Sequence, residues 1–404
     1  APDFALSPKV AFLLDLGRAL QRYGAPAHRL EEALTRVASR LGMEGQYFCV
    51  PTAFFAFLGE RGHRQRAYLE RTASGDTDLA KLSDVYAVAR DVAQGRVLAD
   101  EAQERLQRLQ EAPPRFGAPA TVAACGLAGA TAAMLFGGGL ADMAFGGALG
   151  CVSGLTPLLL RVRPGLSGLA ALLGAFLVSL GAIGLAGLGF RCSPALVTLA
   201  GLVYFLPGLG LVVSMNELAT GHLVSGTTRL AGVSMAFLQL AFGVLLGHQL
   251  GQRWIDTLPS AAAPLPTWIH LPMVAVAALA FLVVFQARLR DYLWILGASL
   301  LAFVGSRLGG SLLGAELGVG LGALLLGIAS NLFSRRYDRP SLTLLLPGLM
   351  LLVPGSWGFR SLGYLLDQQV VQGLTTALHM AALAMALLVG LLLANAVVRP
   401  RMVL

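Results

Sequence analysis

From residue 117 onward, the chain is a succession of apolar segments, each close to the ~20 residues with which a helix crosses ~30 Å of hydrocarbon. Only helices and closed barrels satisfy their own backbone hydrogen bonds in lipid, and segments of this length favour helices. The sequence therefore predicts a mainly α polytopic membrane protein. We expect ten spans, at roughly 118–137, 141–160, 168–188, 194–214, 229–250, 270–287, 292–308, 312–332, 342–356 and 370–396.

The charged residues are concentrated before the first of these spans. Of the 52 Asp, Glu, Lys and Arg residues, 31 lie within residues 1–116, although only 13% of the 404 residues are charged and 56% are hydrophobic. A soluble domain followed by a membrane domain explains this split. We expect a small cytosolic α+β domain at 1–116, a first five-helix repeat at 117–256 and a second at 257–404.

The first 116 residues show the patterns of a small domain with its own core. Apolar residues recur at helical spacing over 8–42, with a break at Tyr23-Gly-Ala-Pro26 that fits either one helix or two. Residues 46–58 are aromatic and extended in character, and 64–72 are suited to pair with them. Two amphipathic helices are expected at 78–93 and 98–109, ahead of a linker at 112–117.

The arginines of the membrane part predict its orientation. With the first domain in the cytosol, ten arginines fall on the cytosolic side and four on the other, which places both termini in the cytosol by the positive-inside rule. The ten are Arg161, Arg163, Arg229, Arg288, Arg290, Arg335, Arg336, Arg339, Arg399 and Arg401, and the four are Arg191, Arg253, Arg307 and Arg360.

A polar break occurs at corresponding places in the two halves of the membrane part. Pro207-Gly208 interrupts the fourth span, and Pro354-Gly355 interrupts the ninth, 147 residues later. A rival register uses Leu346-Pro-Gly-Leu349 at an offset of 140. Because each half has five spans, which is an odd number, the second half is expected to be inserted upside down relative to the first. Broken segments in inverted halves indicate the binding site of a secondary transporter.

Several classes of function are excluded by what the sequence lacks. The four cysteines are scattered, no Cys/His spacing suits a metal, and no phosphate loop or nucleophile motif occurs. Neither a basic stripe for nucleic acid nor a cleavable signal peptide is visible. We therefore expect neither an enzyme nor a cofactor.

Several of these residues resemble one known family. Gly24-Ala-Pro-Ala-His-Arg-Leu-Glu31, Pro51-Thr52 and the two Pro-Gly breaks are similar to the bacterial threonine/serine exporters, over about Val10 to Val398. One departure is Leu30, where that family's pattern has Val. The resemblance implies a cytosolic domain, ten spans and export of small hydroxy amino acids driven by protons, in the inner membrane. Relatives that divide the halves between two chains resemble a dicarboxylate exporter instead.

Ionisable groups inside spans are costly and are candidates for proton coupling. The candidates are Glu217, Asp367, Glu316 and His222, with His379 as a further possible relay. Each also has a structural interpretation: Glu217 and Asp367 as caps of short surface helices, Glu316 as a solvated residue at the rim, and the histidines as packed side chains.

Carrying a hydroxy amino acid requires groups that bind a carboxylate, an ammonium and a hydroxyl. Helix N-termini beyond the two breaks suit the carboxylate, and Glu217 or Asp367 the ammonium. The predicted substrate-binding residues are Pro207, Gly208, Asn216, Thr220, Ser225, Pro354, Gly355 and Gln369.

Arg29 and Glu31 form a charged pair in the first domain. They are interpreted either as plain surface charges or as residues that dock the domain on the inner mouth of the pathway.

The favoured function is export of threonine and serine by exchange with protons. The alternatives are export of a dicarboxylate such as succinate, and a membrane-anchored sensor or scaffold that acts through the first domain. The expected partners are the amino acid, protons and the bilayer, without nucleic acid, and a homo-oligomer is left open.

Overall fold

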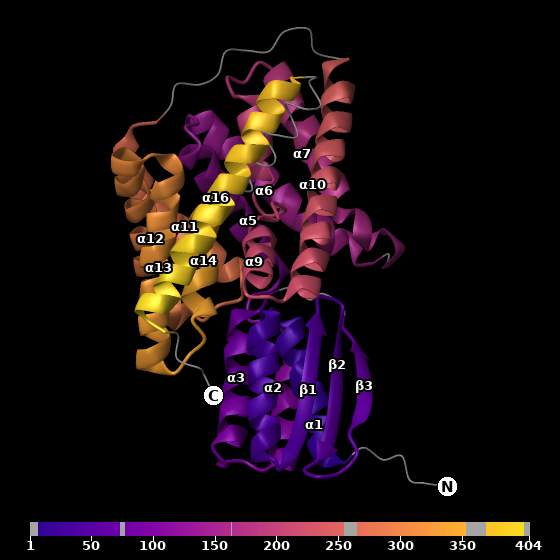
Figure 1. Ribbon diagram of the computed structural model, residues 1–404. Helices are drawn as coiled ribbons and strands as arrows, with labels where there is room; N and C mark the ends of the chain where they lie inside the picture. Colours follow the sequence, from indigo (N-terminus) through magenta and orange to yellow (C-terminus); the bar gives the residue numbers. More distant parts are fainter. Residues whose placement is uncertain (1–6, 73–76, 163, 254–264, 353–368, 400–404) are drawn as a thin grey trace.

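The computed structural model describes residues 7–72, 77–162, 164–253, 265–352 and 369–399. A small unit of helices and strands lies at one end of a taller bundle of apolar helices (Figure 1). We call residues 7–111 the N-terminal unit and the helices from residue 118 onward the bundle.

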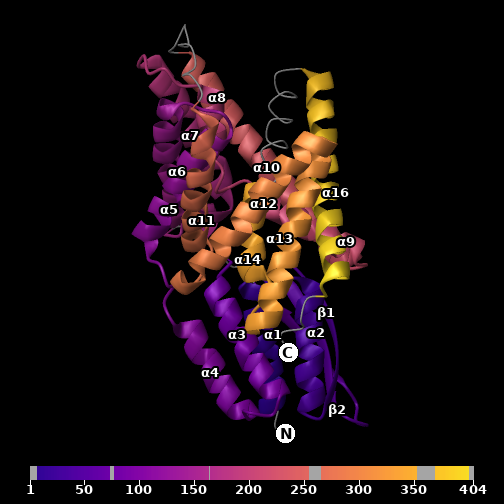
Figure 2. The ribbon, with the colours of Figure 1, turned by 90° about the vertical axis from the view of Figure 1, so that its left-hand side faces the viewer.

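The N-terminal unit has three layers, which Figure 2 shows edge-on. An antiparallel sheet in the order β1-β2-β3 packs on α1 and α2, and α3 and α4 cover the other side of these helices. The helices are α1 (Pro8–Arg22), α2 (Ala27–Arg40), α3 (Leu79–Ala93) and α4 (Ala99–Glu111), and the strands are β1 (Met43–Val50), β2 (Ala53–Glu60) and β3 (Arg66–Arg71).

Alternation along the strands places one face of the sheet in the core. Phe54, Ala56 and Leu58 of β2 are buried against the helices, whereas Phe55 and Phe57 between them are exposed. The extended stretch predicted at 46–58 is therefore a hairpin of two strands. The pattern could not show the turn because both strands are equally apolar.

Of the two alternatives left open for residues 8–42, one helix or two, the structure shows two helices, separated at Tyr23–Pro26. Gly24 there has φ of +96°, a left-handed conformation that favours glycine. Pro26 begins the next helix as its N-cap, and Asp78 caps α3 by accepting a hydrogen bond from the backbone N–H of Lys81 at 2.8 Å.

Eight helices of the described chain are long and apolar enough to cross a membrane, and two shorter apolar helices accompany them. The long ones are α5 (Ala118–Leu135), α6 (Leu140–Leu160), α7 (Ala170–Gly187) with the preceding η1 (Pro164–Leu169), α10 (Leu223–Gln252), α11 (His270–Val284) after η2 (Thr267–Ile269), α12 (Tyr292–Leu313) after η3 (Leu289–Asp291), α13 (Ala315–Tyr337) and α16 (Val370–Val397). The short ones are α9 (Gly208–Ala219), which follows the eight-residue α8 (Pro194–Gly201), and α14 (Leu342–Leu352).

The fourth predicted span is not one helix. α8 ends at Gly201, and α9 starts at Gly208 with Pro207 as its N-cap. Proline cannot donate the backbone hydrogen bond that would continue α8, which explains the interruption. The ninth predicted span begins as α14, and its later part lies outside the described residues.

The first helices of the two halves run in opposite directions. The backbone N–H of Phe116, just before α5, donates to Oε1 of Gln286, just after α11, at 2.8 Å. The start of α5 therefore lies at the end of α11, and the two helices pack against each other. The last helices of the two halves also run in opposite directions, because α10 begins at the N-terminal unit and α16 ends there (Figure 1).

In each half, a buried aspartate lies at the start of the second helix. Its side chain binds the segment that precedes a short helix of the same half. Asp142 of α6 accepts a hydrogen bond from the backbone N–H of Ser193, before α8, at 2.7 Å. Asp291, before α12, pairs with Arg339, ahead of α14. The two aspartates are 1% and 3% exposed. They lie at opposite ends of the bundle, because Arg339 adjoins Asp338, which contacts the N-terminal unit, whereas α6 follows the end of α5 that is far from this unit.

The N-terminal unit is fastened to the bundle through α3 as well as α2. Asp84 of α3 pairs with Arg288, and the backbone N–H of Leu79 donates to the carbonyl of Phe285 at 2.9 Å. Arg90 donates to the carbonyl of Asp338 at 2.8 Å. Because α3 binds loops of the second half and α2 faces α9 and α10 of the first, the unit bridges both halves.

Candidate functional site

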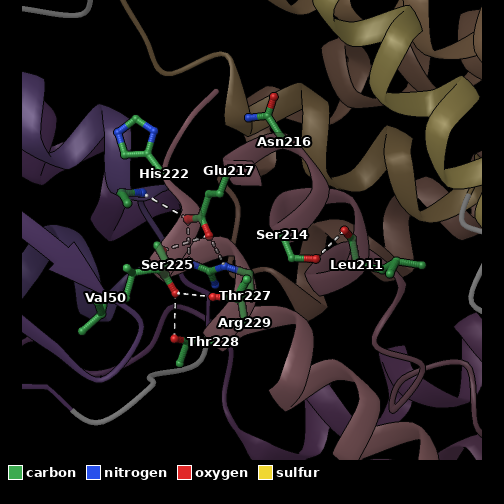
Figure 3. A network of polar contacts seen from close by, with 12 residues as sticks. Val50, Leu211, Ser214, Asn216, Glu217, His222, Ser225, Thr227, Thr228 and Arg229 are labelled. Carbon is green, nitrogen blue, oxygen red and sulfur yellow. Dashed lines mark hydrogen bonds and ion pairs between the residues drawn. The ribbon is translucent and has the colours of Figure 1, made fainter. Parts of the chain in front are cut away.

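Glu217 occupies the boundary between the bundle and the N-terminal unit. It lies near the end of α9, and its side chain is completely buried. Nε and Nη2 of Arg229 each donate to one of its carboxylate oxygens at 3.0 Å, and the Ser225 hydroxyl donates at 3.0 Å (Figure 3). The backbone N–H of Ala27, from the other side of the boundary, donates at 3.4 Å. Both oxygens of the Glu217 carboxylate therefore accept hydrogen bonds.

A second polar contact crosses the same boundary. Nε2 of His222 lies 3.6 Å from Oε2 of Glu31, and the backbone N–H of Cys49 donates to the other Glu31 oxygen at 2.9 Å. Glu31 thereby joins β1 of the N-terminal unit to the residue that precedes α10.

His28 packs beside this contact, with its ring centroid 5.9 Å from that of His222. Burial, Arg29 and His222 lower the pKa of His28 to about 4, against an opposing effect of Glu217. His28 is therefore neutral at physiological pH. Its Nδ1 atom is buried and has no hydrogen-bond partner among the described residues.

Two cavities lie between the N-terminal unit and the bundle. The first measures about 120 Å³, and its wall combines residues of α2 and α3 with residues of α9, α13, α14 and α16. The second measures about 240 Å³ and is bordered by β1, α9, α10 and α14. Pro26, Val213, Leu342 and Leu346 belong to both walls, so the cavities lie side by side.

The first cavity, which we call the arginine cavity, carries the charges of α2. Arg29, Glu32 and Arg36 line it, and Nη2 of Arg36 donates to Glu32 at 3.0 Å. Nη1 of Arg29 lies 3.9 Å from Glu32, which is its nearest carboxylate in the described part of the chain. Asn216 also lines this cavity and points away from the Glu217 carboxylate (Figure 3).

The remaining predicted residues of the first break surround α9. Pro207 and Gly208 start the helix, and Thr220 ends it with its hydroxyl bonded to the carbonyl of Asn216 at 2.8 Å. Ser225 lines the second cavity while it donates to Glu217. The structure thus brings Asn216, Glu217, Ser225 and His222 to one boundary.

The predicted residues of the far end lie apart from this boundary. Glu316, in the first turn of α13, has Oε1 2.8 Å from Nδ1 of His379 on α16. Gln369 is exposed and caps the start of α16. Asp367, Pro354 and Gly355 lie outside the described residues.

Sequence reasoning missed several residues of the boundary. Arg229 counted only as a marker of orientation, although it is twelve positions after Glu217 and binds it. Arg36 and Asn395 also line the arginine cavity and were not expected there. Arg36 could have been found from its place on the same helical face as Arg29 and Glu32. No pattern in the sequence around Asn331 or Asn395 shows that these two residues lie together.

Within the described residues no group of His, Cys, Asp and Glu is arranged to hold a metal ion. All four cysteines are free.

Comparison with known proteins places the chain in a family. Residues 11–251 match the family model described as "Putative threonine/serine exporter", and residues 270–397 match "Threonine/Serine exporter, ThrE". This chain belongs to the threonine/serine exporter family. It is thus a membrane protein of a transporter family, and no catalytic activity is indicated.

The curated proteins to which this chain is similar include fungal proteins and one mycobacterial protein. Pheromone-regulated membrane protein 10 of Candida albicans is 26% identical over 91% of this chain and 34% of its own length. An uncharacterised protein of Schizosaccharomyces pombe is 27% identical over 85% of this chain and 47% of its own length. "Probable threonine/serine exporter" of Mycobacterium tuberculosis is 27% identical over 80% of this chain and 63% of its own length.

This member of the threonine/serine exporter family spans between a third and a half of the two fungal relatives. No solved structure matches it at a significant level.

Proposed function

We propose that this protein is a secondary exporter that moves threonine and serine out of the cytosol in exchange for protons. The observation that carries the proposal is Glu217, a carboxylate buried at the end of a broken membrane helix and held by Arg229 of the next helix. Family membership supports the class of cargo.

The two halves of the bundle are inverted repeats in this account. Support comes from the opposite directions of α5 and α11, from the matching roles of Asp142 and Asp291, and from packing of α10 on α7 as α16 packs on α13. Such halves let a central site face one side of the membrane and then the other. The polar break at Pro354-Gly355 is the proposed counterpart of Pro207-Gly208, and Asp367 is the second candidate acid.

Proton exchange takes place at Glu217 when α10 carries Arg229 away from it. In the closed boundary both carboxylate oxygens are occupied, whereas separation leaves a buried carboxylate without a counter-charge. The freed carboxylate oxygens of Glu217 are the proposed proton acceptor. His222, two positions after Thr220, is the proposed relay between Glu217 and the solvent.

The N-terminal unit is proposed to dock on the cytosolic mouth through Glu31. Its contact with His222 and the neighbouring backbone contact of Ala27 with Glu217 support this role. The arginine asymmetry supports a cytosolic position for the unit and for the end of α16. We place the exporter in the inner membrane of a bacterium, and Glu316 with His379 at the side away from the cytosol.

The test is efflux of labelled L-threonine from proteoliposomes that contain the full chain. An inward proton gradient should accelerate efflux, and the Glu217→Gln variant should lose the acceleration while inserting normally. Glu111→Gln is the matched control, because Glu111 is an exposed residue of α4. Efflux that ignores the gradient would refute the exchange, and the absence of threonine efflux would refute the exporter.

A further inference from the structure

We infer that the arginine cavity binds the carboxylate and ammonium groups of a small zwitterionic amino acid, and that α2 of the N-terminal unit supplies the charged groups. This inference rests on the proposed function for the identity of the cargo. It goes further by making the N-terminal unit part of the binding site rather than a cover over it.

The charges in the wall are spaced for a zwitterion. Arg29 and Arg36 flank Glu32 on one face of α2, so that one acidic group lies between two basic ones. Arg29 is the proposed carboxylate ligand, because at 3.9 Å from Glu32 it makes no hydrogen bond to this neighbour, and a guanidinium binds carboxylates through two parallel hydrogen bonds. Glu32 accepts from the ammonium group.

Neutral polar groups complete the wall. The side chain of Asn216 has no hydrogen-bond partner among the described residues, whereas Asn331 donates to Asn395 at 2.9 Å and to the carbonyl of Val398 at 2.8 Å. These two bonds use the amide nitrogen of Asn331 and the amide oxygen of Asn395. The amide oxygen of Asn331 remains as an acceptor, and the amide nitrogen of Asn395 remains as a donor. A hydroxyl group on the cargo can use both.

His28 and Tyr86 add no charge. Burial lowers the pKa of His28 to about 4 and raises the pKa of Tyr86 to about 12, so that both side chains are neutral at pH 7. The net charge of the wall therefore comes from Arg29, Arg36 and Glu32.

The bundle side of the cavity also contributes five leucines. These are Leu342, Leu345, Leu346 and Leu349 of α14 and Leu391 of α16. A cavity of about 120 Å³ with leucines in its wall suits a small amino acid such as threonine.

Binding of L-threonine to the full chain in lipid nanodiscs, measured by calorimetry, tests this site. Loss of one charge-assisted contact should raise Kd about 10- to 100-fold, so Arg29→Gln and Glu32→Gln should both weaken binding. Arg61→Gln is the matched control, since Arg61 lies in the β2–β3 turn with its side chain 86% exposed. A second readout is modification of an Asn216→Cys variant by maleimide, which threonine should slow; Thr227→Cys, on the exposed surface of α10, should show no protection.

Each outcome decides the assignment. Unchanged Kd in both charge variants, or no protection at position 216, would overturn it even if proteoliposomes export threonine. Tighter binding of succinate than of threonine, improved further by Glu32→Gln, would overturn the zwitterion in favour of a dicarboxylate. Binding that depends on Arg29 and Glu32 without any threonine efflux would support the cavity and refute the exporter.

Discussion

Two acidic side chains near opposite ends of the bundle are held in contrasting ways. Glu217, at the N-terminal unit, is fully buried and bound by Arg229 through two hydrogen bonds of 3.0 Å. Glu316, at the far end, has a side chain 38% exposed and pairs with a His379 side chain that is 49% exposed. Desolvated pairs resist separation, whereas exposed ones exchange freely with water. The difference indicates that the ion pair beside the N-terminal unit is the more firmly held of the two.

The largest loss of stability is expected when Glu217 is left without Arg229. Arg229→Met should destabilise the protein by about 3 to 5 kcal/mol, because an uncompensated charge then stays buried. The measurement is thermal unfolding in detergent, followed by circular dichroism. Adding Glu217→Gln to the same chain should restore part of the loss. If Arg229→Met were as stable as the wild type, the proposed difference between the Glu217 and Glu316 ends of the bundle would be wrong.

The next effect is a pH dependence at the N-terminal unit. The pKa of His28 is lowered from 6.5 to about 4, so between these values the unfolded chain binds more protons than the folded one. The contribution of neutral His28 to the free energy of unfolding is complete above pH 6.5. It is lost as the pH falls toward 4, by roughly 3 kcal/mol in all.

His28→Gln should therefore flatten the loss of stability between pH 6.5 and 4. The groups that face His28 are Arg29, His222 and Glu217, and the variant retains all three. Melting temperatures of variant and wild type across this range provide the measurement. The same slope in both proteins would show that the pH dependence originates elsewhere.

A smaller effect is expected at the contact between Glu31 and His222. Both side chains are about one quarter exposed, and the closest atoms are 3.6 Å apart. Glu31→Gln should cost about 0 to 1 kcal/mol. Hydrogen exchange of α2 should nevertheless quicken, since the docking contact is weakened. Unaltered exchange in α2 would mean that α3, through Asp84 and Arg288, holds the unit alone.

The smallest effect is expected at the far end. Glu316→Gln removes a contact between two exposed side chains, so its melting temperature should equal that of the wild type. A loss comparable to that of Arg229→Met would contradict the contrast, because it would mean that both ion pairs are held equally firmly.

The fold was accessible from the sequence where the pattern was long and periodic. Helices around Ala118–Leu135 and Leu223–Gln252 follow from apolar length, and the break at Pro207 follows from the missing backbone donor. The hairpin at Met43–Glu60 was not resolved, because two adjacent apolar strands read as one. The count of ten spans stays a prediction, with eight long helices and two short ones described.

The site was accessible only in part. Its elements lie far apart in the chain, as shown by Ala27, which donates to Glu217 from 190 positions away. A carboxylate in an apolar stretch identified Glu217 as a candidate, since buried charge is costly. The facing helix α2, which supplies Arg29 and Glu32 to the cavity, could be recognised as charged but could not be placed.

Proton movement driven by the cargo tests the exchange most directly. Proteoliposomes with a pH-sensitive dye inside, preloaded with L-threonine and diluted into buffer without it, should become acidic inside as threonine leaves. The Glu217→Gln variant should show no such change. Threonine efflux from the wild-type protein at constant internal pH would contradict the account.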